Sequence, residues 1–226
     1  MLARVPLLRL VRSRALWAIV IGWTLLVLGG AIAHKRHGMP HGVDDALDLY
    51  ASFALPWLVF SLVGFALADQ SLGKSGEALV VLGASPARVA LATVLVTMGA
   101  GALVGAVLGG GTVLLAHGPG DPPLLVDTLE TLAFGGVAGA SYAALMLLGA
   151  SFVGGLWGRG LAALLDWVLG SDYGFGACLT PRAHLRNLLG GEAPFDLVPW
   201  ESLALLVITG AVFAALAVQR AARTRV

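Results

Sequence analysis

The hydrophobic residues of this chain are gathered into long runs that are separated by short polar segments. One run of uncharged residues covers 49–68, similar runs cover 15–33, 87–116, 128–156 and 202–218, and a shorter, more polar run covers 160–178. A helix rises about 1.5 Å per residue, so about 20 apolar residues cross the ~30 Å hydrocarbon core of a bilayer. The pattern predicts an all-α integral membrane protein with six transmembrane helices, organised as a single domain over residues 1–226.

Composition agrees with this prediction. Hydrophobic residues make up 58% of the chain and charged residues 12%, about half the ~25% of charged residues that is typical of globular domains. The single cysteine, Cys178, excludes an internal disulfide and a cysteine-based metal cluster. The net charge of +1 gives no indication of nucleic-acid binding.

Lysine and arginine are distributed unevenly between the two sides that six alternating spans would create. With the N-terminus in the cytoplasm, the cytoplasmic segments hold ten basic residues: Arg4, Arg9, Arg12, Arg14, Lys74, Arg88, Arg159, Arg220, Arg223 and Arg225. The external segments hold four: Lys35, Arg36, Arg182 and Arg186. The positive-inside rule therefore predicts that both termini are cytoplasmic. Arg outnumbers Lys twelve to two, which is typical of a GC-rich bacterial genome. Together with the predicted spans and topology, we expect a multi-pass protein of the bacterial inner membrane.

The first 15 residues mix apolar side chains with four arginines. This composition suits an amphipathic helix that lies in the inner headgroup region, although a basic flank that only sets the topology has the same composition. Small residues recur at every fourth position of the third and fourth spans: Gly101, Gly105 and Gly109, then Gly135, Gly139 and Ala143. Such rows predict close approach of the two helix backbones.

The segment between the second and third spans reads DQSLGKSGEALVVLGASPAR and covers 69–88. It predicts a short helix over 76–82, a turn over 83–86, and a third span that begins near Pro86 with Ser85 as its N-cap. A short cytoplasmic helix could serve as a docking lever, and an ordinary connecting loop is the alternative. Lys74 lies in a Gly-Lys-Ser sequence, but Ala68 occupies the place of the first P-loop glycine and a membrane span precedes it, so we expect no ATP site here.

Asp166 lies inside the predicted fifth span. An unpaired carboxylate in the bilayer centre costs about 2.5–3.5 kcal/mol, so this group is expected to be paired, protonated or in contact with water. It could serve a proton relay or a translocation path, or it could cap a half-helix, and the short segment could also lie shallowly in the membrane.

The last external segment predicts a short helix with Thr180 as its N-cap, Pro181 as its first residue and Gly190 just after its end. Its leucines would form an apolar face that dips into the outer leaflet, while Arg182, His184 and Arg186 would stay at its polar outer end. These arginines could pair with acids of a neighbouring helix or meet anionic lipid headgroups.

The first external segment is rich in possible metal ligands: His34, His37, His41, Asp44, Asp45 and Asp48. Imidazole and carboxylate groups could bind Zn²⁺ or Cu²⁺. However, Lys35 and Arg36 would repel a cation, and the spacing matches no specific ligand pattern. We therefore expect a solvated polar loop and no metal site.

In layout and loose motifs the chain resembles the six-span permease subunits of ABC transporters of the type-2 exporter class. The resemblance is carried by the leader MLARVPLLRLVRSRA, by the loop SLGKSGEALVVLGASPARV, and by the tail from LTPRAHLRNLLGG to the basic C-terminus. It implies an N-terminal interfacial helix, a cytoplasmic coupling helix between spans two and three, and a re-entrant external helix after span five.

The resemblance also implies a function. A separate ABC ATPase subunit, which would carry the ATP and Mg²⁺, would dock on the coupling segment through Lys74, Glu77 and Arg88. A second permease subunit would complete the translocation pathway as a homo- or heterodimer in the lipid bilayer, and the chain itself would be no enzyme and would need no cofactor. The alternatives are an ATP-independent channel, scaffold or assembly factor, or an integral-membrane enzyme, although no HExxH or GxSxG pattern occurs.

Overall fold

The computed structural model describes residues 2–37, 42–118, 121–170 and 174–223, and this part of the chain is helical with no strand. Within it, five segments are long and apolar enough to cross a membrane: α2 (Arg14–Arg36), α3 to α4 (Gly42–Leu67), α6 (Pro86–Ala116), α7 (Leu124–Phe152) and α10 (Pro199–Arg223). An all-α membrane protein is therefore confirmed at this level. The predicted fifth span, 160–178, is not among the five, because α8 (Gly155–Leu169) is only 15 residues long.

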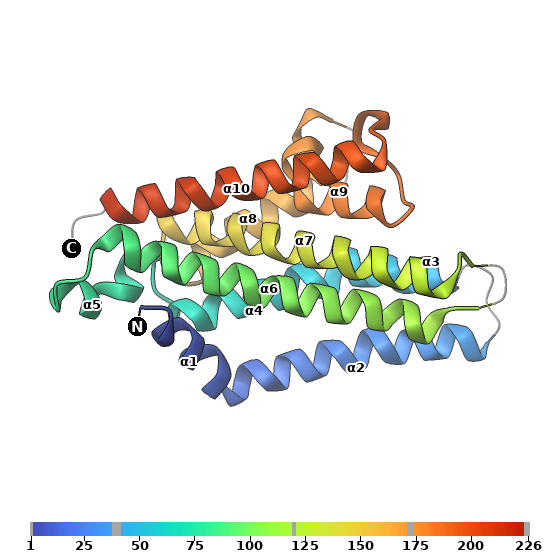
Figure 1. Cartoon of the computed structure of the whole chain (residues 1–226), viewed down its shortest axis with the longest axis horizontal. Helices are drawn as coiled ribbons and strands as arrows, with labels where there is room; N and C mark the ends of the chain where they lie inside the picture. The colour runs from blue at the N-terminus through green and yellow to red at the C-terminus, as the bar shows by residue number, and fades with distance from the viewer. Residues whose placement is uncertain (1, 38–41, 119–120, 171–173, 224–226) are drawn as a thin grey trace.

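The long helices lie side by side along one axis, and both chain ends lie at the same end of the bundle as α5 (Glu77–Val81) (Figure 1). Helices α6 and α7 run in opposite directions, whereas α7 and α10 both run toward the end that holds the termini (Figure 1). The chain between α7 and α10 must therefore return along the bundle. Helix α8 and helix α9 (Pro181–Leu188) lie in this part of the chain.

The second long segment begins earlier than the predicted span of 49–68. Helix α3 (Gly42–Leu49) continues through a π-helical stretch, Tyr50–Ala54, into α4 (Leu55–Leu67). The irregularity has a local cause, because Pro56 has no N–H group and its ring crowds the carbonyl group four residues earlier. A π-helical turn is a common way to shift the hydrogen-bond ladder at such a point.

Helices α6 and α7 pack backbone to backbone, as their rows of small residues predict. A methyl group added at Gly101 or Gly105 would collide with the carbonyl oxygen of Gly139 or Gly135. The Tyr50 hydroxyl donates a hydrogen bond of 2.8 Å to the Gly105 carbonyl and ties the second long segment to this pair. These three segments form the centre of the bundle.

The predicted N-terminal helix is present as α1 (Arg4–Arg12), which lies at an angle to α2 (Figure 1). The chain turns between them at Ser13, whose hydroxyl accepts a hydrogen bond from the Leu16 amide. On α1, Leu10 packs against Leu62 and Ala66 of α4.

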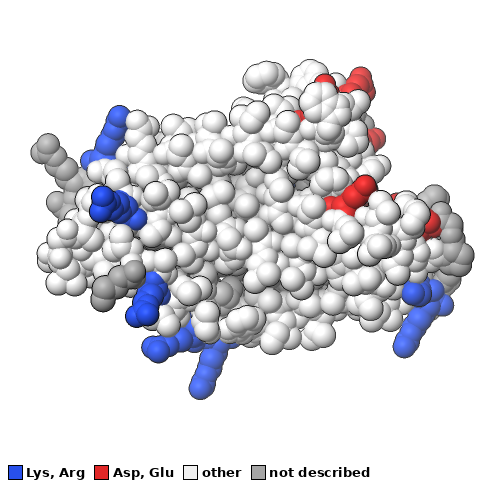
Figure 2. All heavy atoms as spheres, viewed as in Figure 1, with Lys and Arg blue, Asp and Glu red and all other residues white. Residues whose placement is uncertain are grey.

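Charged residues gather at the two ends of the molecule (Figure 2). In this view a broad band without Lys, Arg, Asp or Glu separates basic residues at the end that holds the termini from acidic residues at the other end, where a few basic residues also lie. Large apolar side chains such as Leu25 and Leu103 are exposed on the long helices. This distribution suits a body surrounded by lipid.

Candidate functional site

The segment between α4 and α6 projects from the end of the bundle that holds the termini (Figure 1). A 3-10 turn, η2 (Lys74–Gly76), leads into α5, and α6 begins at Pro86 with Ser85 in the N-cap position, which confirms the predicted helix, turn and start of the third span. Lys74, Glu77 and Arg88 are all exposed.

Two apolar side chains stand at the tip of this projection. Val81 is 77% exposed and Leu82 is 83% exposed, although neither lies on a helix that spans the bundle. The sequence predicted only charged contacts in this segment. It did not predict this apolar pair, although Val81 and Leu82 stand directly before Gly83, where the short helix ends.

The base of the projection is held to two helices, α7 and α1. The Leu72 amide donates to the Ala150 carbonyl of α7 at 3.2 Å. From α1, the Arg9 guanidinium donates to the Ala66 and Ser75 carbonyls, both at 3.2 Å. The projection is thus connected to α1 and α7 by hydrogen bonds that leave its tip free.

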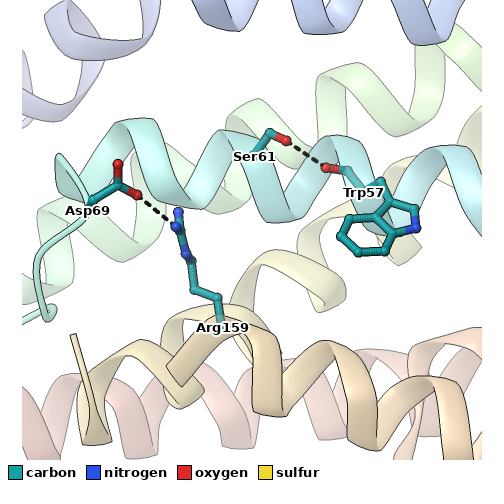
Figure 3. A network of polar contacts seen from close by, with 4 residues as sticks. All are labelled: Trp57, Ser61, Asp69 and Arg159. Atoms are coloured by element: carbon teal, nitrogen blue, oxygen red, sulfur yellow. Dashed lines mark hydrogen bonds and ion pairs between the residues drawn. The ribbon is translucent and has the colours of Figure 1, made fainter. Parts of the chain in front are cut away.

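A buried arginine joins the start of α8 to the end of α4 (Figure 3). Arg159 is 3% exposed, and its Nη2 lies 2.7 Å from Asp69 Oδ1. The guanidinium passes Gly64, where a Cβ atom would overlap it, and lies 4.8 Å from the centre of the Phe60 ring. From the sequence, Arg159 counted only as a cytoplasmic flanking charge. Figure 3 also shows the Ser61 hydroxyl donating to the Trp57 carbonyl along α4.

Helix α8 and helix α9 (Pro181–Leu188) meet end to start, although 11 residues separate Leu169 from Pro181. The Arg182 amide at the start of α9 donates to Asp166 Oδ1 on α8 at 3.2 Å, and Asp166 is 3% exposed. Thr180 holds the N-cap position as predicted, but its hydroxyl donates to the Ala177 carbonyl, so Asp166 supplies the cap instead. Of the interpretations open for Asp166, the cap of a half-helix is the one the structure contains.

The polar side chains of α9 do not stay at a polar outer end, and that prediction was wrong for two of them. Arg182 is 8% exposed and His184 is fully buried, because α9 packs against both α7 and α10. Only Arg186 lies partly open, and its Nε is 3.7 Å from Asp48 Oδ1 of α3. A helix expected to lie on the surface is thus a part of the core.

His184 has a structural role in a chain of hydrogen bonds. Its Nε2–H donates to the Cys178 carbonyl at 2.9 Å, so Nδ1 accepts from the Ser202 hydroxyl at 3.1 Å. Ser202 Oγ in turn accepts from Asn187 Nδ2 at 2.8 Å. The Cys178 carbonyl can only accept, and this fixes the direction of the whole chain of hydrogen bonds.

An apolar groove of about 710 Å³ runs between α8 and the second long segment. Two of its lining residues are Asp166 and Arg182, which meet where α8 ends and α9 begins. The Arg182 guanidinium lies 4.3 Å from the centre of the Trp167 ring. The full lining consists of Ser52, Phe53, Pro56, Trp57, Phe60, Leu156, Gly160, Ala163, Leu164, Asp166, Trp167 and Arg182.

The acidic residues of the first external segment lie on helix α3 and not in a loop, which corrects the prediction of a solvated loop there. His34 Nδ1 is 3.7 Å from Asp45 Oδ2, and Asp48 accepts from the Ser52 hydroxyl. His41 lies outside the described residues. Among those described, no group of three His, Cys, Asp or Glu side chains is placed to hold a metal ion.

Comparison of this chain with protein-family models, with curated proteins and with solved structures finds no match.

Proposed function

We propose that this protein is the membrane-embedded permease subunit of an ATP-driven ABC transporter, an exporter, and that a separate ATPase subunit docks on α5. The observation that carries the proposal is the projection itself: Val81 and Leu82 are exposed beside the charged residues Glu77 and Arg88. An apolar pair within a polar rim is the usual composition of a protein docking surface. The resemblance of layout to six-span permeases supports the same assignment.

The connections at the base of the projection favour a mechanical role. A partner that moved α5 would pull on Arg9 of α1 and on the Leu72–Ala150 hydrogen bond to α7. Since the Asp69–Arg159 pair follows directly after α4, the same motion would reach α8. Movement of α5 would thus act on three helices, α1, α7 and α8.

The proposal includes an orientation in the membrane, with the termini and α5 on the cytoplasmic side. The termini and α5 lie at one end, and that end carries most of the basic residues seen in Figure 2. The positive-inside rule assigns this end to the cytoplasm of a bacterial inner membrane, where ATP is available. A second permease subunit would cover the exposed face of α8, on which Leu156 is 66% exposed and Trp157 is 77% exposed.

Affinity purification from native membranes tests the docking step. The tagged wild-type chain should retain an ATPase subunit in mild detergent, and the double variant Val81→Glu/Leu82→Glu should lose most of it, because two charges would be buried at the contact. Gln219→Glu is the matched control, since it adds a charge at the same end on the exposed surface of α10 and should leave the complex intact. Full retention of the ATPase by the double variant would refute the assignment of α5.

A further inference from the structure

We infer that the groove between α8 and the second long segment binds a single-chain amphiphile with a carboxylate head, which lies at Arg182 with its apolar chain along the aromatic wall. The inference depends on the groove alone and not on a docked ATPase. If the proposed transport function holds, it names the chemical class of the cargo.

Four of the twelve residues that line the groove are aromatic. Phe53 and Trp167 stack edge to face across it with ring centres 5.1 Å apart, and Trp57 and Phe60 pair along α4 at 5.5 Å. The volume of about 710 Å³ lies inside the range of roughly 300–1,000 Å³ that is usual for sites of one small ligand. An apolar wall with very few polar groups is also the usual composition of such sites.

Arg182 forms the charged end of the groove. Its side chain is more than nine-tenths buried, it lines the groove, and its Nε finds no hydrogen-bond partner among the described residues. A buried donor without a partner costs free energy, and an anionic ligand would recover it once the guanidinium turned its Nε toward the groove. A guanidinium binds a planar carboxylate through two parallel hydrogen bonds, which favours this head over an uncharged one.

Asp166 interacts electrostatically with Arg182 and also holds the backbone of that residue. Its Oδ1 already accepts the Arg182 amide at the start of α9, where the helix dipole favours a negative group. The guanidinium lies instead over the Trp167 ring, on the groove side. The cation is therefore positioned for a ligand in the groove.

The depth of Arg182 in the membrane distinguishes a bound ligand from an ordinary phospholipid as the occupant of the groove. The groove reaches Phe53, which lies near the middle of the Gly42–Leu67 segment. A bilayer phospholipid keeps its head at the membrane surface, so it cannot place an anionic group at this depth without leaving its leaflet. The occupant is thus a molecule that the protein holds.

Fluorescence quenching by brominated amphiphiles tests the inference on the full-length protein in an uncharged detergent. Dibromostearate should quench the indole emission of Trp57 and Trp167 with saturation, and the double variant Trp57→Phe/Trp167→Phe should lose that saturable part. The methyl ester of the same chain should bind about tenfold more weakly, because it offers no charge to the guanidinium. Arg182→Gln should weaken dibromostearate to the same degree and leave the methyl ester unchanged.

A variant that fills the groove tests the inference independently, in case the Arg182 variant does not fold. Gly160 lines the groove, and a Cβ atom added there meets nothing within 4 Å, so Gly160→Leu fills the space without disturbing packing. It should abolish the saturable quenching, whereas Gly99→Leu, at an equally open position on α6, should preserve it. Equal affinity for carboxylate and ester, or quenching that survives Gly160→Leu, would overturn the inference.

Discussion

Asp166 illustrates how the surroundings of one side chain decide its role. Within an apolar run the residue pointed equally to proton transfer, translocation or capping, because each of these places a carboxylate in the membrane. The structure puts it at the meeting point of two short helices, where it accepts the Arg182 amide. Its carboxylate therefore compensates an amide that has no partner within α9.

This role predicts different outcomes for two substitutions. Asp166→Asn keeps an oxygen acceptor for the Arg182 amide and should stay close to wild type in thermal stability. Asp166→Ala leaves that amide unsatisfied and should lose about 1–2 kcal/mol, the usual cost of a lost N-cap. Thermal unfolding of both purified variants in detergent measures the difference, and equal losses would show that the charge, rather than the cap, is what the site requires.

Among the helices, the α6–α7 pair shows the strongest agreement between sequence pattern and packing. Lipid is as apolar as a leucine side chain, so close backbone contact between small residues, rather than hydrophobic burial, holds membrane helices together. Gly101 and Gly105 face Gly139 and Gly135 across the contact. Not every glycine has this role, because Gly99 of the same helix faces open space.

The pair Gly105→Ala and Gly99→Ala separates contact from helix propensity. The methyl group at position 105 would meet the Gly135 carbonyl, so we expect a loss of about 1–3 kcal/mol from overpacking. The same change at position 99 should be neutral or slightly stabilising, because alanine is the better helix former. Midpoints of thermal unfolding compare the two, and similar midpoints would contradict the close packing of α6 on α7.

The topology of the molecule depends on whether α8 and α9 together cross the membrane once. Neither is long enough to cross a bilayer, yet α7 and α10 run in the same direction (Figure 1), so we expect α8 and α9 together to bring the chain back across the membrane. The arrangement places the α5 projection and both chain ends at one end, and the segment after α9 at the other.

Cysteine labelling tests this topology. In a Cys178→Ser background, Glu77→Cys and Gln219→Cys should react with an impermeant maleimide from one side of the membrane, and Glu192→Cys should react from the opposite side. All three positions are exposed. Labelling of positions 77 and 219 from opposite sides would mean an odd number of crossings and would exclude a crossing by α8 and α9 together. Permeabilised membranes provide the control in which every position reacts.

The sequence by itself determined the helical class, five of the six apolar segments it predicted as spans, the start of α6 at Pro86 and the small-residue contact, because each depends on local composition and helical periodicity. Only the tertiary structure decided that α9 is buried, that Arg159 crosses Gly64 to reach Asp69, and that Asp166 and Arg182 border an aromatic groove. Those features join residues that are distant along the chain. No periodicity encodes which faces of two separate helices meet, since that depends on how all the helices share one limited interior.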